Sequence, residues 1–157
     1  MKKYLHQIKI VLIALLCVFI LYDVGRDQTS LVGIESVTEE VLEAAKMKDV
    51  VPAEERMVKR FYGLNPKDYE GAVLFAPKDN MDVNEIFIVK LKDASQAEEV
   101  EKAIRDRLET QQKSFEGYGA EQTALLKAHT LDVRGNYVFY MVGENVTAAH
   151  KAFLNSL

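Results

Sequence analysis

The hydrophobic and polar positions divide the chain into one unbroken apolar run and a longer stretch of mixed periodicity. The run is Ile10–Tyr22, and Lys2, Lys3 and Lys9 precede it. Farther on, some segments have apolar residues three and four positions apart, and others alternate apolar with polar residues. The first spacing is typical of helices with one buried face, and the second is typical of strands. The pattern predicts an N-terminal transmembrane helix followed by a small α+β domain.

The strongest periodic segment is Ala94–Tyr118, which predicts a long amphipathic helix. Ser95 and Glu98 form a capping-box pattern at its start, and Gly117 and Gly119 are expected to end it near Phe115. Charged residues occupy the face opposite the apolar positions. The apolar face comprises Ala97, Val100, Ile104, Leu108, Gln111 or Gln112, and Phe115.

Two amides, Gln111 and Gln112, stand where this apolar face predicts a leucine or isoleucine. One interpretation is that one amide faces solvent and the other lies at the edge of the core, because buried amides need hydrogen-bond partners. The other is that one amide is buried and hydrogen-bonded to a strand or loop, which would fix how the helix docks. We expect Gln112, Phe115 and Tyr118 to hold the helix on its sheet.

The other elements follow from capping, turn and alternation patterns. Ser36 and Glu39 form a second capping box, and Pro52 is expected at the first position of a helix over 53–62 that stops at Gly63. A short helix is expected over 120–127, and Asn145 or Thr147 caps a last helix. Two hairpins are predicted, joining 71–77 to 85–91 and 129–133 to 137–142.

Together these elements predict a two-layer domain with a four-stranded, mainly antiparallel sheet packed by helices. The expected boundaries are residues 1–24 for a signal anchor, 25–35 for a linker and 36–157 for the α+β domain.

The apolar run is interpreted as an uncleaved signal anchor. No small-x-small cleavage site follows it, and Cys17 lacks the preceding small residue that a lipid-attachment signal requires. With Lys9 reaching the headgroups and tyrosines at both ends, residues 4–24 are long enough to cross a bilayer. The preceding lysines place the N-terminus in the cytoplasm and residues 25–157 outside, in a single-pass protein of the cell membrane. The alternative is a hydrophobic helix buried in a soluble protein.

Net charge argues against nucleic acid as a partner. The chain has a formal charge of −4, and without Lys2, Lys3, Lys9 and Asp23 it holds 17 basic and 23 acidic residues, a balance of −6. Such a domain is repelled by phosphate backbones. Cys17 is the only cysteine, so an intramolecular disulfide is excluded.

One set of segments resembles a family of bacterial envelope proteins, the domain-of-unknown-function family 4358 common in clostridia and their relatives. The resemblance covers about Thr38–Leu157 and implies the fold and an envelope location, with no established activity. Many relatives carry a lipoprotein cysteine that this chain lacks, which favours the helix as its anchor. The matching segments are Phe61-Tyr62-Gly63-Leu64, Glu85-Ile86-Phe87-Ile88, Arg107 with Gln111–Tyr118, and Gly135-x-Tyr137.

No residue pattern predicts an enzyme, a metal site or a cofactor. His129 and His150, with Asp132 or Glu144, have no recognisable ligand spacing. Nucleophilic residues such as Ser114 have no base at a known spacing, and no glycine-rich phosphate loop occurs. A pair of carboxylates, Glu85 and Glu116, offers the groups for acid–base work, although acidic residues on a solvated face are common.

The remaining candidate is a shallow binding surface formed by Gln112, Glu116, Tyr118 and Tyr137, against the alternative that these tyrosines belong to the core. We therefore expect a non-catalytic interaction or accessory module that binds an envelope protein or polymer. The alternative function is a small envelope hydrolase or transferase subunit that uses Glu/His chemistry. A deep pocket containing Glu85, Glu116 or His129 favours the enzyme, and an apolar patch beside Tyr118 favours the binding module.

Overall fold

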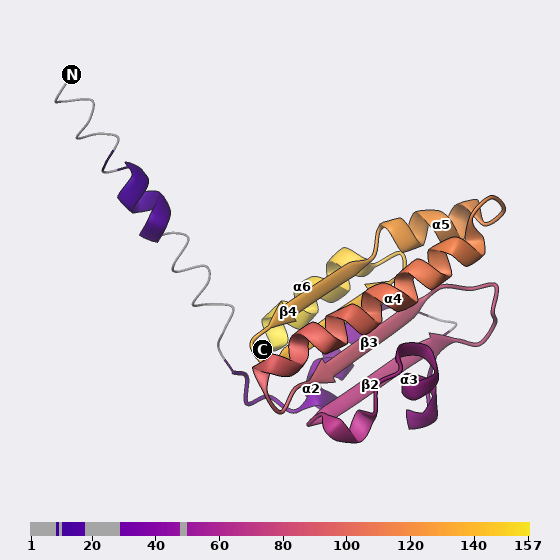
Figure 1. Ribbon diagram of the computed structural model, residues 1–157, viewed down its shortest axis with the longest axis horizontal. Helices are drawn as coiled ribbons and strands as arrows, with labels where there is room; N and C mark the ends of the chain where they lie inside the picture. The colour runs from indigo at the N-terminus through magenta and orange to yellow at the C-terminus, as the bar shows by residue number, and fades with distance from the viewer. Residues whose placement is uncertain (1–8, 10, 18–28, 48–49) are drawn as a thin grey trace.

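The computed structural model describes residues 9, 11–17, 29–47 and 50–157, and its folded domain has a five-stranded antiparallel sheet (Figure 1). The strand order is β1-β2-β3-β5-β4, in which β1 and β4 form the edges. The strands are β1 (Val50–Pro52), β2 (Gly71–Pro77), β3 (Glu85–Lys90), β4 (Thr130–Arg134) and β5 (Tyr137–Val142). The helices are α2 (Ile34–Ala45), α3 (Glu55–Tyr62), α4 (Ala97–Phe115), α5 (Ala120–Lys127) and α6 (Val146–Ser156).

Both predicted hairpins are present, and they join through their inner strands. β2 pairs with β3, β4 pairs with β5, and β3 lies beside β5 with Ile88 opposite Phe139. Every residue of β3 and β5 is buried. Because successive side chains of a strand point to opposite faces, these two strands need cover on both sides of the sheet.

Helices supply that cover on each face, so the domain has three layers and the predicted two-layer arrangement is wrong. Ile86 and Ile88 of β3 pack with α2 and α6, whereas Phe87 and Val89 pack with α3, α4 and α5. In Figure 1 the sheet lies between these two groups of helices. The apolar run in β3 contains residues for both faces, which is the pattern of a strand covered on each side.

The predicted count of four strands is also wrong, because Val50–Pro52 forms the edge strand β1. Pro52 lies opposite Phe75 of β2 and does not begin a helix; α3 begins at Glu55. Proline is tolerated on an edge strand because its missing N–H can face away from the sheet. A three-residue strand is too short to show alternation in sequence.

The helix ends are partly as predicted. α4 ends at Phe115 and α5 spans 120–127 as expected, but neither predicted capping box caps its helix. α2 begins at Ile34, two residues before Ser36. Before α4, Asp93 accepts a hydrogen bond from the Ser95 amide and Gln96 accepts one from the Asp93 amide, which caps a 3-10 turn over Ala94–Gln96.

The N-terminal prediction lies largely outside the described residues. Residues 9 and 11–17 are helical, and the side chains of 11–17 are exposed. In the part of the chain that the structure describes, no helix has both the length and the apolarity needed to cross a membrane. Of the predicted linker, Ser30 and Val32 hydrogen-bond to the folded domain, and residues 34–35 belong to α2.

The three-layer arrangement makes α6 part of the core on one face of the sheet. Phe153 of α6 is fully buried and stacks on Phe139, with ring centroids 4.9 Å apart. Phe153→Ala is expected to lower the free energy of unfolding by about 3–5 kcal/mol, because it leaves a cavity in the core. Urea denaturation of the full chain in mild detergent, followed by circular dichroism, measures this loss. The control is Leu154→Ala, whose side chain is partly exposed, and equal losses for both variants would contradict the prediction.

Candidate functional site

Two large apolar side chains are exposed at one end of the domain, where the β2–β3 loop meets the turn between α4 and α5. Tyr118 is 65% exposed and Met81 is 56% exposed. Gln122 joins the two segments, because its Nε2 donates a hydrogen bond to the Met81 carbonyl at 3.2 Å. We call Met81, Glu116, Tyr118 and Gln122 the Tyr118 surface. Its mixture of exposed apolar and polar groups is typical of protein interfaces.

The four predicted binding residues do not form one site. Glu116 and Tyr118 are exposed at the end of α4, and Gln112 is half-buried three residues before Phe115. Tyr137 is fully buried on the sheet face covered by α2 and α6, where its hydroxyl donates to the Val32 carbonyl at 2.6 Å. Burial, followed by the carboxylates of Glu70 and Glu35, raises the pKa of Tyr137 to about 12. Tyr137 is a core residue and does not border the Tyr118 surface.

The docking of α4 also differs from the prediction. Phe115 is buried as expected, but Tyr118 rests against it from outside, with ring centroids 5.8 Å apart. Gln111, not Gln112, is the buried amide, at 6% exposure. Its Oε1 has no hydrogen-bond partner within the described residues, so a bond to a strand or loop does not fix the helix.

A small pocket of about 140 Å³ lies between α4 and the β2–β3 loop. Arg107, Gln111 and Ser114 line it from α4, and Asp79 and Asp82 line it from the loop. Asp82 Oδ1 accepts hydrogen bonds from the amides of Val83 and Asn84, so this carboxylate shapes its own loop. The pocket is too small for a large substrate.

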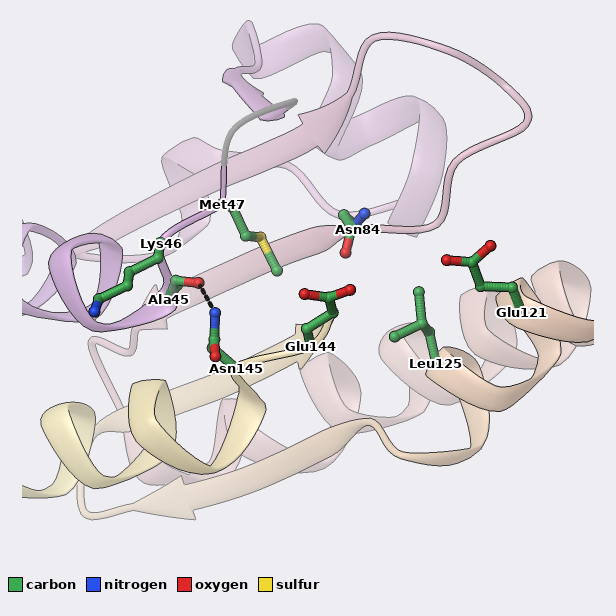
Figure 2. Close-up of a pocket in the computed structure, with 8 residues that line it drawn as sticks. All are labelled: Ala45, Lys46, Met47, Asn84, Glu121, Leu125, Glu144 and Asn145. Carbon is green, nitrogen blue, oxygen red and sulfur yellow. Dashed lines mark hydrogen bonds between the residues drawn. The ribbon is translucent and has the colours of Figure 1, made fainter.

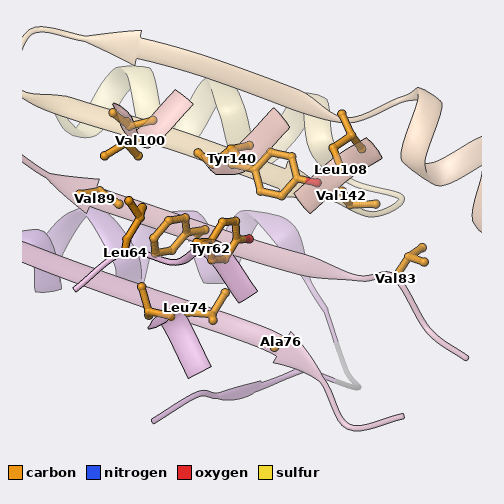
Figure 3. Packing of buried hydrophobic residues seen from close by; sticks show 14 of the residues in the cluster. Tyr62, Leu64, Leu74, Ala76, Val83, Val89, Val100, Leu108, Tyr140 and Val142 are labelled. Carbon is orange, nitrogen blue, oxygen red and sulfur yellow. The ribbon is translucent and has the colours of Figure 1, made fainter. Parts of the chain in front are cut away.

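Beneath this pocket, a buried carboxylate joins three elements. Glu85 of β3 is fully buried; Tyr62 of α3 donates to its Oε1, and Arg107 of α4 donates to its Oε2 at 2.9 Å. Tyr62 stacks on Phe87 at 4.2 Å, and the Arg107 guanidinium lies 4.1 Å from the centre of the Phe61 ring. Figure 3 shows Tyr62 and Tyr140 among the aliphatic side chains of this face. We call Tyr62, Glu85, Arg107 and Tyr140 the Glu85 cluster.

Electrostatics within the Glu85 cluster keep its phenols neutral and its guanidinium charged. Burial, reinforced by the Glu85 carboxylate, raises the pKa of Tyr62 and of Tyr140. For Arg107, burial lowers the pKa, but the attraction of Glu85 outweighs it and leaves the pKa raised. Both Glu85 oxygens are bonded and no part of this residue is exposed. Glu85 therefore has no access to a substrate and does not pair with the exposed Glu116.

The two histidines in the described part of the chain are separated, and of these two His150 alone contacts an acidic residue. His150 Nε2 lies 2.7 Å from Asp132 Oδ2, which also binds Arg134 Nε at 3.0 Å. His129 Nδ1 instead lies 2.8 Å from the Leu126 carbonyl. Among the described residues, no group of three histidine, cysteine or acidic side chains is arranged to hold a metal ion.

A second pocket, of about 280 Å³, lies where the end of α2, α5 and the start of α6 meet (Figure 2). Glu121 and Glu144 line it together with Asn84 and Lys46. The Asn145 side chain donates to the Ala45 carbonyl at 3.0 Å and so ties α6 to α2 at its wall. Its residues come from four distant segments, so no local pattern in the sequence indicated this pocket.

Comparison with protein families identifies the domain. A family model described as "Domain of unknown function (DUF4358)" matches residues 43–143. The chain belongs to this family. The matched DUF4358 range includes all five strands, α3 to α5, the Glu85 cluster and the Tyr118 surface. It leaves out α6 and most of α2. No curated protein and no solved structure matches the chain.

Three of the segments that carried the resemblance to DUF4358 meet at the Glu85 cluster. Phe61 and Tyr62 come from the first segment, Glu85 begins the second, and Arg107 belongs to the third. No local pattern in the sequence indicated that they touch, because they lie more than twenty positions apart. This contact gives the three segments a structural role, because it holds α3 and α4 on β3.

The two phenols of the Glu85 cluster are expected to respond differently to removal of the hydroxyl. Tyr62→Phe leaves a Glu85 oxygen unpaired and is expected to cost about 1.5–3 kcal/mol at pH 7. Tyr140→Phe is expected to cost less than about 1 kcal/mol, because the Tyr140 hydroxyl has no partner within the described residues. Urea denaturation of the full chain in detergent measures both, and an equal loss would contradict this assignment.

The raised tyrosine pKa values also predict alkaline sensitivity. Tyr62, Tyr137 and Tyr140 have pKa values in the folded state above the unfolded value. Their contribution to the free energy of unfolding is therefore complete below about pH 10 and is lost as the pH rises through the folded-state pKa values. Stability is expected to fall above about pH 10, and less steeply in Tyr140→Phe. Denaturation at a series of pH values tests this, and parallel curves for the two proteins would argue against it.

Proposed function

We propose that this DUF4358 protein is a membrane-anchored, non-catalytic interaction module of the bacterial cell envelope. In this proposal the Tyr118 surface binds an envelope protein or polymer outside the cytoplasm. The observation that carries it is the exposure of Tyr118 and Met81 on neighbouring segments, beside polar Glu116 and Gln122. Aromatic residues and methionine are enriched at the centres of interfaces, where polar groups form the rim.

The architecture supports binding by this surface. Tyr118 follows α4, whose buried face and Glu85–Arg107 ion pair fix its position on the sheet. Tyr118 is therefore presented by a rigid support, which lowers the conformational entropy lost on binding. The aromatic ring of Tyr118 already rests against Phe115.

The membrane anchor is the second part of the proposal. Its support is the apolar run Ile10–Tyr22 after three lysines, and the exposure of side chains 11–17 in the structure. Five of these side chains are large and apolar, each between 57% and 61% exposed: Val11, Leu12, Ile13, Leu15 and Leu16. A bilayer would cover such a group.

Site-specific photocrosslinking tests the Tyr118 surface. A photoreactive residue in place of Tyr118 is expected to form an adduct with an envelope component in native membranes, and the same residue in place of Leu154, on α6, is expected to form much less. Tyr118→Ala is expected to abolish the function while changing the free energy of unfolding by less than about 0.5 kcal/mol, because its side chain is exposed. A large loss of stability would instead show that Tyr118 supports the core.

A reporter that is active only outside the cytoplasm tests the topology when it is fused after Leu157. We expect activity from the full chain, since lysines before the apolar run favour a cytoplasmic N-terminus. A matched fusion that lacks residues 1–24 is expected to be inactive. Activity of a cytoplasm-specific reporter alone at this position would refute the anchor.

A second candidate function is a small envelope hydrolase or transferase subunit. The contact between His150 and Asp132 at 2.7 Å favours it, since an aspartate that orients a histidine is a common arrangement for proton transfer. Within the described residues, however, His150 has no hydrogen bond to a serine, threonine or cysteine nucleophile. In cells that depend on this protein, loss of function in His150→Gln with normal crosslinking at position 118 would favour the enzyme over the interaction module.

A further inference from the structure

The segment that leads from the N-terminal region into the domain is held at one end of the sheet. The Ser30 amide donates to Asn136 Oδ1 at 2.8 Å, and Asn136 Nδ2 donates to the Ser30 carbonyl at 3.2 Å. The Ser30 hydroxyl donates to the carbonyl of the last residue, Leu157, at 3.3 Å. Ser30 is thus fixed beside the β4–β5 turn.

Between the two fixed residues Ser30 and Val32 lies Leu31, whose side chain is 95% exposed. On the C-terminal side of Leu31, the Val32 carbonyl accepts a hydrogen bond from the Tyr137 hydroxyl. The Val32 amide donates to the Ser30 hydroxyl at 3.2 Å. The backbone on both sides of Leu31 is therefore held, and its apolar side chain is directed away from the domain.

The number of residues between the predicted anchor and Ser30 limits how far Ser30 can lie from a membrane. The predicted anchor ends at residue 24, and six residue steps lead from there to Ser30. A fully extended chain advances at most about 3.6 Å per residue, so Ser30 lies within about 22 Å of the end of the anchor. The domain is longer than this reach, because the 19 residues of α4 alone extend about 28 Å.

The surroundings of Leu31 suit the interfacial region of a bilayer. A hollow of about 340 Å³ beside this segment is lined by Thr29, Lys92 and Asn136. The Lys92 ammonium donates a hydrogen bond to the Lys67 carbonyl at 2.8 Å. Glu70 also lines the hollow, so its lining carries both a negative and a positive side chain. The exposed apolar side chain of Leu31 is therefore the main feature of this surface. Lysine can keep its ammonium among headgroups while its stem lies deeper.

We infer that this end of the domain rests on the bilayer, with Leu31 inserted among the lipid headgroups. The inference rests on the membrane anchor of the proposed function and adds which face of the domain contacts the lipid. Ala94, just before α4, lines the same hollow as Thr29, and α4 runs from there to Phe115. The Tyr118 surface consequently projects about 28 Å away from the membrane-facing end, where a partner can reach it.

The single natural cysteine allows a test with the full chain. A fluorophore is attached to Cys17, or to the cysteine introduced by Leu31→Cys or Tyr118→Cys, each in the Cys17→Ser background. Each protein is reconstituted into vesicles of phosphatidylcholine and phosphatidylglycerol. Nitroxide lipids labelled at the headgroup or deep in the acyl chain, and iodide in the water, then quench each fluorophore according to its depth.

The label at position 31 is expected to be quenched by headgroup nitroxides and to be about five-fold less accessible to iodide than the label at position 118. The label at position 118 controls for insertion driven by the fluorophore itself. Equal iodide quenching at 31 and 118, with Cys17 quenched by acyl-chain nitroxides, would overturn the inference and leave the anchor intact. Absence of acyl-chain quenching at Cys17 would overturn the anchor, and the inference with it.

Discussion

The need to bury both faces of β3 and β5 governs this domain. Each strand places apolar side chains on both sides of the sheet, as with Ile88 and Val89 in β3. A single layer of helices would leave one of these faces in water, at a cost of roughly 25 cal/mol for each Å² of apolar surface. α2 and α6 therefore cover one face, while α3, α4 and α5 cover the other. The positions of Leu157 and of the α4–α5 turn follow from this arrangement.

The Glu85 cluster fixes how the second layer lies on the sheet. A carboxylate that is completely buried is tolerated only with partners, and Glu85 takes one from α3 and one from α4. An ion pair of this kind adds little net stability compared with apolar packing, but loss of either partner is costly. It penalises any docking of α3 or α4 that separates Tyr62 or Arg107 from β3. Through α4, the same constraint determines where Tyr118 is presented.

The two ends of the domain differ in chemistry, and this difference organises the proposed function. One end holds the entering segment through Asn136 and leaves Leu31 exposed. The other presents Tyr118 and Met81. The proposed lipid contact at one end and the proposed binding surface at the other suit a module that displays a recognition site at a fixed distance from the membrane. The DUF4358 match covers the sheet and the Tyr118 surface but not Leu31.

The sequence by itself determined most of the helical and strand segments of the folded domain and where several of them end. β2, β5 and α5 have the predicted bounds, and α4 ends at Phe115, because local periodicity and glycine positions control these features. Only the tertiary structure decided which apolar faces meet, that three layers form, and that Val50–Pro52 adds a strand. It also decided that Tyr137 is buried while Tyr118 is exposed, although both are tyrosines beside glycine turns. Periodicity shows that a face is apolar, but the partner that covers it comes from residues far away in the chain, and those contacts also bring Tyr62, Glu85 and Arg107 together.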